Sequence, residues 1–270
     1  MQPTITPLDA SLGATITDID QADLDETTWP IVEDAFHEYA ALIFPNQHLT
    51  EEAQIAFANL FGEIEILRGN EGWHSDSSYM PLAAKASVLA AIIVPSSGGE
   101  TAVADMRAAY DALDQDMKER VEGLSAYHSL YQSQAKIGHI VKTGAGYGYH
   151  NTGAPLRPLV NVHPVTGRKS LFIGRHAYRI PSMDDDDAQI LLDELLEFAC
   201  QPPRTYFHQW QPGDVFIWDN RCALHAAQPY NYDEPRVMRH TRVAGDPASE
   251  LVTTGRDERA ADFIPAASNM

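Results

Sequence analysis

The chain has 270 residues and a mass of 29.8 kDa, and 44% of its residues are hydrophobic, which is enough to fill a sizeable core. This composition excludes a disordered or fibrous protein. The 19 Lys and Arg residues against 38 Asp and Glu residues give a net charge of −19. Such a surface repels phosphate backbones and anionic membranes, so we expect no nucleic-acid partner and no membrane partner.

Four helices are predicted from apolar residues at helical spacing. Their spans are 25–41, from 49 onward, 105–124 and 186–200. Thr50 stands before two acidic residues and is expected to cap the second helix. The aspartates 184–187 are interpreted as favourable charges at the start of the fourth helix rather than as a cation site.

Between the helices, short β-like runs bounded by turn residues predict strands. Their spans are 40–44, 86–94, 159–163, 170–173, 205–210, 214–218 and 237–243. Regular strand–helix–strand alternation is absent. We therefore expect a mainly β fold with flanking helices, an antiparallel sandwich or jelly roll, in one domain spanning residues 1–270.

The cysteines, the first residues and the apolar runs indicate the cellular compartment of the protein. Cys200 and Cys222 offer neither a disulfide framework nor a paired Cys-x-x-Cys zinc motif, which suits a reducing compartment. The first residues lack the basic patch and apolar core of a secretory signal. The longest clean apolar run, 88–94, is too short to span a bilayer. We expect a soluble, cytoplasmic protein.

The candidate metal ligands are His74, Asp76 and His225. His74-Ser75-Asp76 is the only His-x-Asp triplet among 11 histidines, and alternation along a strand would put both side chains on one face. Two imidazoles and one carboxylate leave one side of a metal open, an arrangement that suits non-haem Fe(II), a chelating cosubstrate and O2. Zinc prefers a tetrahedral set. Taken alone, each histidine is more simply a structural residue.

A second set of residues points to a dicarboxylate. Arg236 is expected on the strand after His225, where its guanidinium can hold a carboxylate in two parallel hydrogen bonds. Thr101 follows a glycine turn and can donate its hydroxyl to the same group. The alternatives are an ion pair of Arg236 with Asp233 or Glu234, and an ordinary strand position for Thr101.

Together these motifs resemble the Fe(II)/2-oxoglutarate-dependent taurine and 2,4-dichlorophenoxyacetate dioxygenase family. The likeness extends from about Leu12 to Asp246, and its motifs are residues 73–79 (WHSDSSY), 98–106, 218–225 and 236–245, in the order of that family. The stretches 104–113, 155–164, 173–176 and 236–245 look most similar to the aryloxyalkanoate branch, of the (S)-dichlorprop type.

The resemblance implies a double-stranded β-helix, which is a jelly roll. It implies that His74, Asp76 and His225 hold Fe(II), and that Thr101 and Arg236 bind the distal carboxylate of the cosubstrate 2-oxoglutarate. The expected reaction uses O2 to hydroxylate a small carboxylate. If this is an aryloxyalkanoate, the product collapses to a phenol and a 2-oxo acid, while the cosubstrate yields succinate and CO2.

The chain departs from the family at two places. Taurine-type members carry an arginine four positions after the cosubstrate arginine, where this chain has His240, so a sulfonate substrate is disfavoured. Relatives also carry a longer segment ahead of the His-x-Asp motif, whereas here Gly62 is followed closely by Trp73. Either a lid is trimmed or a stretch is missing.

The substrate is expected to be a small anionic molecule. The candidates for binding its carboxylate are Arg175 and His176, with Tyr79 as a hydroxyl donor. Arg175 can equally form a structural ion pair. Arg239 and Arg242 are reserve candidates, and strand alternation predicts that both point to the side opposite His240.

Two other functions stay open, together with the assembly. The same chemistry can act on a sulfonate, an alkyl sulfate or another small metabolite, or the jelly roll can bind a metal without turnover. The pair Arg236 and Thr101 separates these classes, because a binding module has no need of a dicarboxylate pocket beside the metal. We also expect a homo-oligomer.

Overall fold

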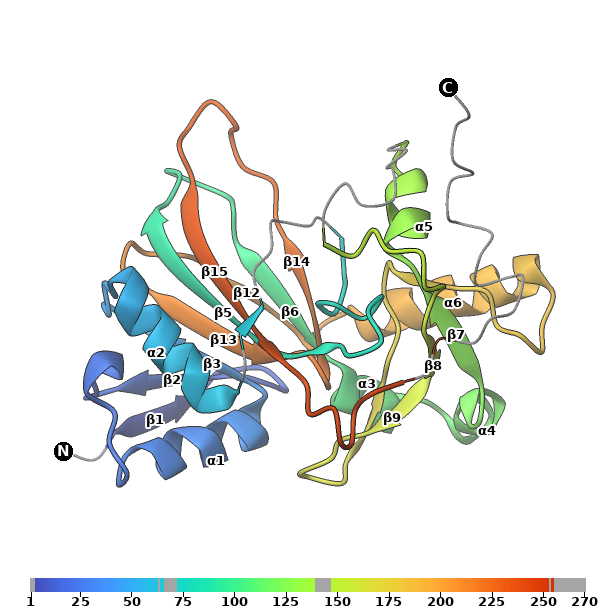
Figure 1. Cartoon of the computed structure of the whole chain (residues 1–270), viewed down its shortest axis with the longest axis horizontal. Coiled ribbons are helices and arrows are strands. Elements are labelled where there is room, and N and C mark those ends of the chain that lie inside the picture. Colours follow the sequence, from blue (N-terminus) through green and yellow to red (C-terminus); the bar gives the residue numbers. More distant parts are fainter. Residues whose placement is uncertain (1–2, 63, 66–71, 139–146, 253, 255–270) are drawn as a thin grey trace.

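The computed structural model describes residues 3–62, 64–65, 72–138, 147–252 and 254. Its largest sheet has seven strands in the order β1-β2-β3-β13-β5-β15-β4 (Figure 1). The bounds are β1 (Thr4–Pro7), β2 (Ala14–Thr17), β3 (Ala41–Phe44), β4 (Ile64–Glu65), β5 (Ala84–Ile93), β13 (Val215–Asp219) and β15 (Val237–Ala244).

A second, three-stranded sheet faces the inner side of the large one. It runs in the order β12-β6-β14 and consists of β6 (Thr101–Asp105), β12 (Thr205–His208) and β14 (Ala223–Ala227). Side chains of both sheets meet in one apolar core, in which Phe216 and Trp218 of β13 contact the region of Val103 on β6. The fold is therefore mainly β with flanking helices, and it is the jelly roll that the sequence predicted.

Strand β13 shows how alternation builds the two layers. Val215 and Ile217 point to a cluster formed with α1 (Trp29–Tyr39) and α2 (Glu51–Phe61), which cover the outer face of the large sheet (Figure 1). Phe216 and Trp218 point to the inner side. Every residue of β13 is buried, as expected for a strand that is covered on both faces.

The short 3-10 helix η1 (Gln21–Asp23) packs against α2. The remaining elements lie beside the two sheets, toward the right of Figure 1. They are α3 (Met106–Ala112), α4 (Gln115–Val121), β7 (Ser125–His128), α5 (Leu130–Ala135), β8 (Leu156–Pro158), β9 (Val160–Val162), β10 (Lys169–Leu171), β11 (Ala177–Tyr178) and α6 (Asp185–Ala199). Strands β11, β7 and β8 form one small sheet, and β10 pairs with β9. Within the described ranges, no helix is both long and apolar enough to cross a membrane.

The predicted helices are present, with one correction. Thr50 caps α2 by accepting from the Ala53 amide at 3.2 Å, and Asp184 caps α6. The single helix predicted over 105–124 is wrong: the chain forms α3 and α4 instead. The break occurs because the Asp114 carboxylate accepts from the Met117 amide at 2.7 Å and starts a new helix.

The predicted strands also form, with shifted ends, whereas β1, β2, β4, β6, β7, β8, β11 and β14 were not predicted. The shortened segment expected between Gly62 and Trp73 falls largely on residues 63 and 66–71, which lie outside the described residues.

Candidate active site

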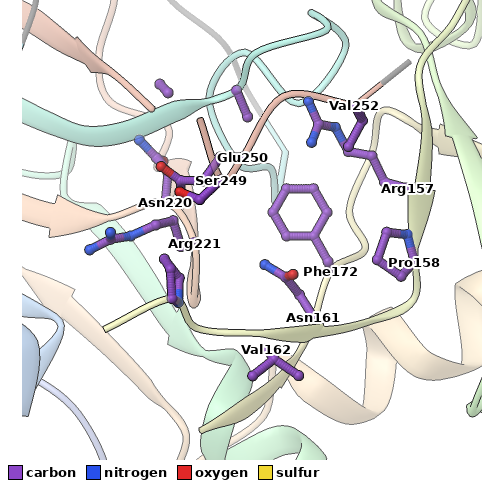
Figure 2. A pocket seen from close by; sticks show the side chains of 13 residues that line it. Arg157, Pro158, Asn161, Val162, Phe172, Asn220, Arg221, Ser249, Glu250 and Val252 are labelled. Carbon is purple, nitrogen blue, oxygen red and sulfur yellow. The ribbon is translucent and has the colours of Figure 1, made fainter. Parts of the chain in front are cut away.

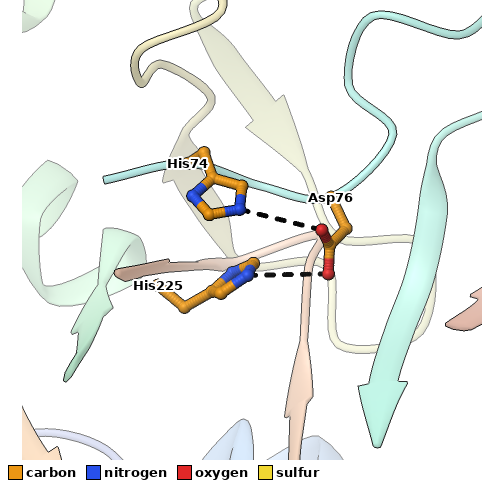
Figure 3. Close-up of side chains that lie close together, drawn as sticks. All are labelled: His74, Asp76 and His225. Carbon is orange, nitrogen blue, oxygen red and sulfur yellow. Dashed lines mark ion pairs between the residues drawn. The ribbon is translucent and has the colours of Figure 1, made fainter. Parts of the chain in front are cut away.

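His74, Asp76 and His225 meet in the interior, as Figure 3 shows. Their ligand atoms all lie within 4.8 Å of one another. Asp76 Oδ1 is 3.8 Å from His74 Nε2, and Asp76 Oδ2 is 3.6 Å from His225 Nε2. All three residues are at least 90% buried, so the predicted constellation comes together from distant parts of the chain.

The main chain fixes the two histidines against each other. The amide of His74 donates to the carbonyl of His225 at 2.9 Å, and the amide of His225 donates back at 2.8 Å, which makes an isolated antiparallel bridge. His225 lies on β14. Asp76 lies in a turn, so the prediction that it shares a strand with His74 is wrong, although the two side chains do converge.

The protonation of the site suits metal binding. The Nδ1–H of His74 donates to the Gly72 carbonyl at 2.7 Å, which leaves the Nε2 lone pair directed at Asp76. Burial lowers the pKa of His74 and of His225, so both imidazoles are neutral. Burial alone would raise the pKa of Asp76, but the Arg242 guanidinium holds it well below its ordinary range.

Two residues of β15 surround the carboxylate. His240 Nε2 is 3.6 Å from Asp76 Oδ2, and Arg242 Nη2 is 2.7 Å from Asp76 Oδ1. The expectation that Arg242 faces away from His240 is wrong, because residues two apart on a strand share a face. Arg239 does face the other way, where it donates to the Leu49 carbonyl at 3.2 Å.

These observations fit a divalent metal. Two neutral imidazoles and one ionised carboxylate converge on one centre, which is the donor set preferred by non-haem Fe(II). His225 Nδ1 is buried and has no hydrogen-bond partner among the residues that the structure describes. The geometry therefore supports a metal held by His74, Asp76 and His225.

Thr101 lies on the same face of its sheet as His225. His225 pairs with Val103 across β6 and β14, and Thr101 is two residues from Val103 on the same strand. The Nε1–H of Trp210 donates to Thr101 Oγ1 at 3.1 Å, so the hydroxyl hydrogen of Thr101 stays available for another acceptor. The sequence analysis did not identify this role of Trp210.

Arg236 approaches the same region just before β15. Its Nη2 donates to the Gly99 carbonyl at 3.1 Å, and its Nε is buried without a partner in the described part of the chain. A Cβ at Gly99 would lie 3.1 Å from that Nε, and Gly99 has a φ of +72°, so glycine favours this close approach. Glu234, the alternative ion-pair partner, instead accepts from the amide and hydroxyl of Ser96. A guanidinium with an unused donor fits a carboxylate ligand.

The three substrate candidates lie next to the triad. The ring of His176 is 5.6 Å from that of His74 and 4.9 Å from that of Tyr79, measured between centroids. Arg175 donates through its amide to the Trp73 carbonyl at 2.9 Å and through Nη2 to the Ser133 carbonyl at 3.4 Å.

His163, Asp219 and Cys222 form a second buried group with metal-ligand atoms, but these atoms are already engaged. His163 Nδ1 accepts from the amides of residues 165 and 166, and its Nε2–H donates to Asp219 at 3.0 Å. Asp219 is also paired with Arg221. Burial raises the pKa of the Cys222 thiol, so it stays protonated. This cluster is structural.

A separate pocket of about 140 Å³ opens beside the turn after β13 (Figure 2). Its lining includes Asn220, Arg221, Arg157 and Glu250 but none of the triad. Arg157 already donates to the carbonyls of Ser78 and Met80 at 2.7 and 2.6 Å. Both arginines that line the pocket are therefore engaged, since Arg221 is paired with Asp219, and the triad is the stronger candidate for the active site.

Comparisons with known proteins agree with this site. The family model described as "Taurine catabolism dioxygenase TauD, TfdA family" matches residues 4–71 and 66–242. The chain is 52% identical to the (S)-phenoxypropionate/alpha-ketoglutarate-dioxygenase of Sphingobium herbicidovorans, over 91% of this chain and 96% of that protein. It is 46% identical to the protein of the same name from Delftia acidovorans, over 91% and 96%.

A solved structure is similar as well. The crystal structure of AAD-2 in complex with Mn(II) and N-oxalylglycine superimposes with a TM-score of 0.85 at 40% identity, over 90% of this chain and 98% of that one. Fold, donor set and relatives coincide, and the chain belongs to the TauD/TfdA family of dioxygenases.

Proposed function

We propose that this chain is an Fe(II)- and 2-oxoglutarate-dependent dioxygenase that hydroxylates a small carboxylate, an aryloxyalkanoate. The hydroxylated substrate would collapse to a phenol and a 2-oxo acid, with succinate and CO2 released from the cosubstrate. The observation that carries this proposal is the convergence of His74, Asp76 and His225 within 4.8 Å. The 52% identity to a phenoxypropionate dioxygenase supports the substrate class.

In this proposal the protein's own residues bind and orient the reactants. His74, Asp76 and His225 hold the iron, which, when bound, supplies the oxidising chemistry with O2. Arg236 pairs with the distal carboxylate of 2-oxoglutarate, and Thr101 donates its hydroxyl to the same group. Thr101 lies on the face that carries His225, and Arg236 bonds to the Gly99 carbonyl close to Thr101 in the chain, so these two residues would hold the distal carboxylate of a cosubstrate at the side of the metal site.

Arg175 supplies the charge for the substrate carboxylate. Its cation contributes to the lowering of the pKa of His74, after burial and the Arg242 guanidinium. His176 is neutral, because burial lowers its pKa well below its ordinary value. Since the Ser133 hydroxyl donates to the Leu130 carbonyl at 2.9 Å, it accepts from His176 Nδ1–H, and His176 Nε2 presents an acceptor. Tyr79 and His176 line the substrate site.

An anaerobic titration tests the cofactor assignment. Fe(II) and 2-oxoglutarate added together are expected to give a weak visible charge-transfer band, and His74→Ala is expected to abolish it. If the intact protein gives no band, the oxygenase assignment is refuted.

Succinate release across aryloxy acids, sulfonates and alkyl sulfates tests the substrate class. We expect aryloxy acids to stimulate release; stimulation by sulfonates or alkyl sulfates alone would establish the alternative substrate class instead. Arg175→Ala is expected to uncouple succinate release from substrate oxidation while 2-oxoglutarate still binds. Homo-oligomerisation and a cytoplasmic location stay predictions from the sequence.

A further inference from the structure

The Asp76 carboxylate is engaged on both of its oxygens by side chains of the large sheet. The Ser87 hydroxyl on β5 donates to Oδ2, and Arg242 on β15 lies 2.7 Å from Oδ1. In the sheet register Ser87 is directly opposite Arg242 on one side and opposite Trp218 on the other. Arg242, Ser87 and Trp218 therefore form one row across three adjacent strands, and this row lies beneath the turn that carries Asp76.

Asn220, in the turn after β13, connects this row to the main chain of Asp76. Its Oδ1 accepts from the Asp76 amide at 3.2 Å and from Trp218 Nε1 at 3.2 Å. Two donors at one end of the amide fix its orientation, so the Nδ2 end faces Ser87 and donates to Oγ at 2.9 Å. Asn220 and Ser87 are both fully buried.

The direction of these hydrogen bonds is determined. Because Ser87 Oγ accepts from Asn220, its own hydrogen is directed to Asp76 Oδ2. A carboxylate offers about four lone pairs. After the contacts with Ser87 and Arg242, lone pairs of Asp76 therefore remain for a metal. Asp76 lies in a turn rather than a strand, and its orientation depends on these contacts.

We propose that Ser87 is a positioning residue that holds the Asp76 carboxylate in its metal-binding orientation, and that Asn220 acts through Ser87. This inference rests on the proposed function, because it takes the triad as the metal site. Residues that hold a ligating carboxylate from outside the coordination sphere typically contribute about 10- to 100-fold to metal affinity. Neither residue was a site candidate in the sequence, although Asn220 lies within the motif 218–225.

The experiment is a Mn(II) titration of the full chain by calorimetry, with Mn(II) as the probe. Ser87→Ala is expected to weaken Mn(II) binding about tenfold or more. Ser170→Ala is the matched control, because Ser170 is also fully buried and donates to a main-chain carbonyl, that of Arg221, at 3.3 Å. It is expected to bind Mn(II) as the unaltered chain does, with both metal-free variants unfolding at similar temperatures.

Asn220→Ala is measured alone and in the Ser87→Ala background. If Asn220 acts through Ser87, its substitution costs less in that background than alone; equal costs refute this part. The positioning role is overturned if the Kd for Mn(II) of Ser87→Ala lies within twofold of that of the unaltered chain. It is also overturned if Ser170→Ala loses as much Mn(II) affinity as Ser87→Ala. Failure of the unaltered chain to bind Mn(II), or full binding by His74→Ala, would instead overturn the metal site and with it the proposed function.

Discussion

Replacing Thr101 with valine tests the cosubstrate anchor most directly, because the two side chains are nearly isosteric. The Thr101 hydroxyl already accepts from Trp210 Nε1 at 3.1 Å, so its single hydrogen is the one it can give to a carboxylate. A hydrogen bond to a charged group contributes about 1.5–3 kcal/mol. At about 1.4 kcal/mol per tenfold, Thr101→Val is expected to raise the Kd for 2-oxoglutarate about 10- to 100-fold.

The assay is an anaerobic 2-oxoglutarate titration of the metal-loaded protein. Thr241→Val is the matched control: Thr241 is also a buried strand threonine, and it accepts from Gln54 Nε2 at 3.3 Å on the outer side of the large sheet. A Kd within twofold of the unaltered chain for Thr101→Val, or the same rise for both variants, would refute the anchoring role.

Three other substitutions test the site and its surroundings. Arg236→Lys replaces a planar guanidinium, which can donate two parallel hydrogen bonds, by a compact ammonium group. The same titration should show a Kd for 2-oxoglutarate about tenfold higher, and an unchanged Kd would contradict two-point binding of the carboxylate. Burial lowers the pKa of His128 well below its ordinary value of 6.5, so unfolding takes up a proton as the pH falls below 6.5 and stability is lost in that window. His128→Gln should flatten the pH dependence of urea unfolding between pH 6 and 5 by about 1.4 kcal/mol per pH unit, and an equal slope would count against a buried neutral imidazole. Arg157 donates to three carbonyls of the turn at residues 78–81, and Arg157→Lys keeps the charge but reaches fewer of them. We expect a loss of about 3 kcal/mol in urea unfolding, and a loss below about 1 kcal/mol would show that these bonds are dispensable.

The three candidate metal ligands, which the structure brings together, could be selected from the sequence because their chemistry is carried by residue type. Their local structure could not be predicted. Gly72 and Ser77 both have positive φ, at 85° and 55°, and these two positions interrupt the strand that alternation suggested around His74 and Asp76. The side chains meet because the bridge to His225 and the turn both direct them inward.

Two strands that build the site gave little signal in the sequence. Strand β6 reads TAVAD and β14 reads ALHAA, and alanine is depleted in strands. They form strands because close packing between the two sheets admits small side chains, which is a property of the assembled fold. The contacts of Ser87 likewise depend on cross-strand register, which no local pattern in the chain specifies.

The reciprocal amide–carbonyl pair between His74 and His225 has a consequence for the life of the enzyme. It holds the two imidazole-bearing positions at a set separation through peptide groups, which neither oxidation nor chelation of an ion removes. We therefore expect the two imidazole positions to keep their separation when the iron is removed, so that the centre can be reloaded without a refolding step.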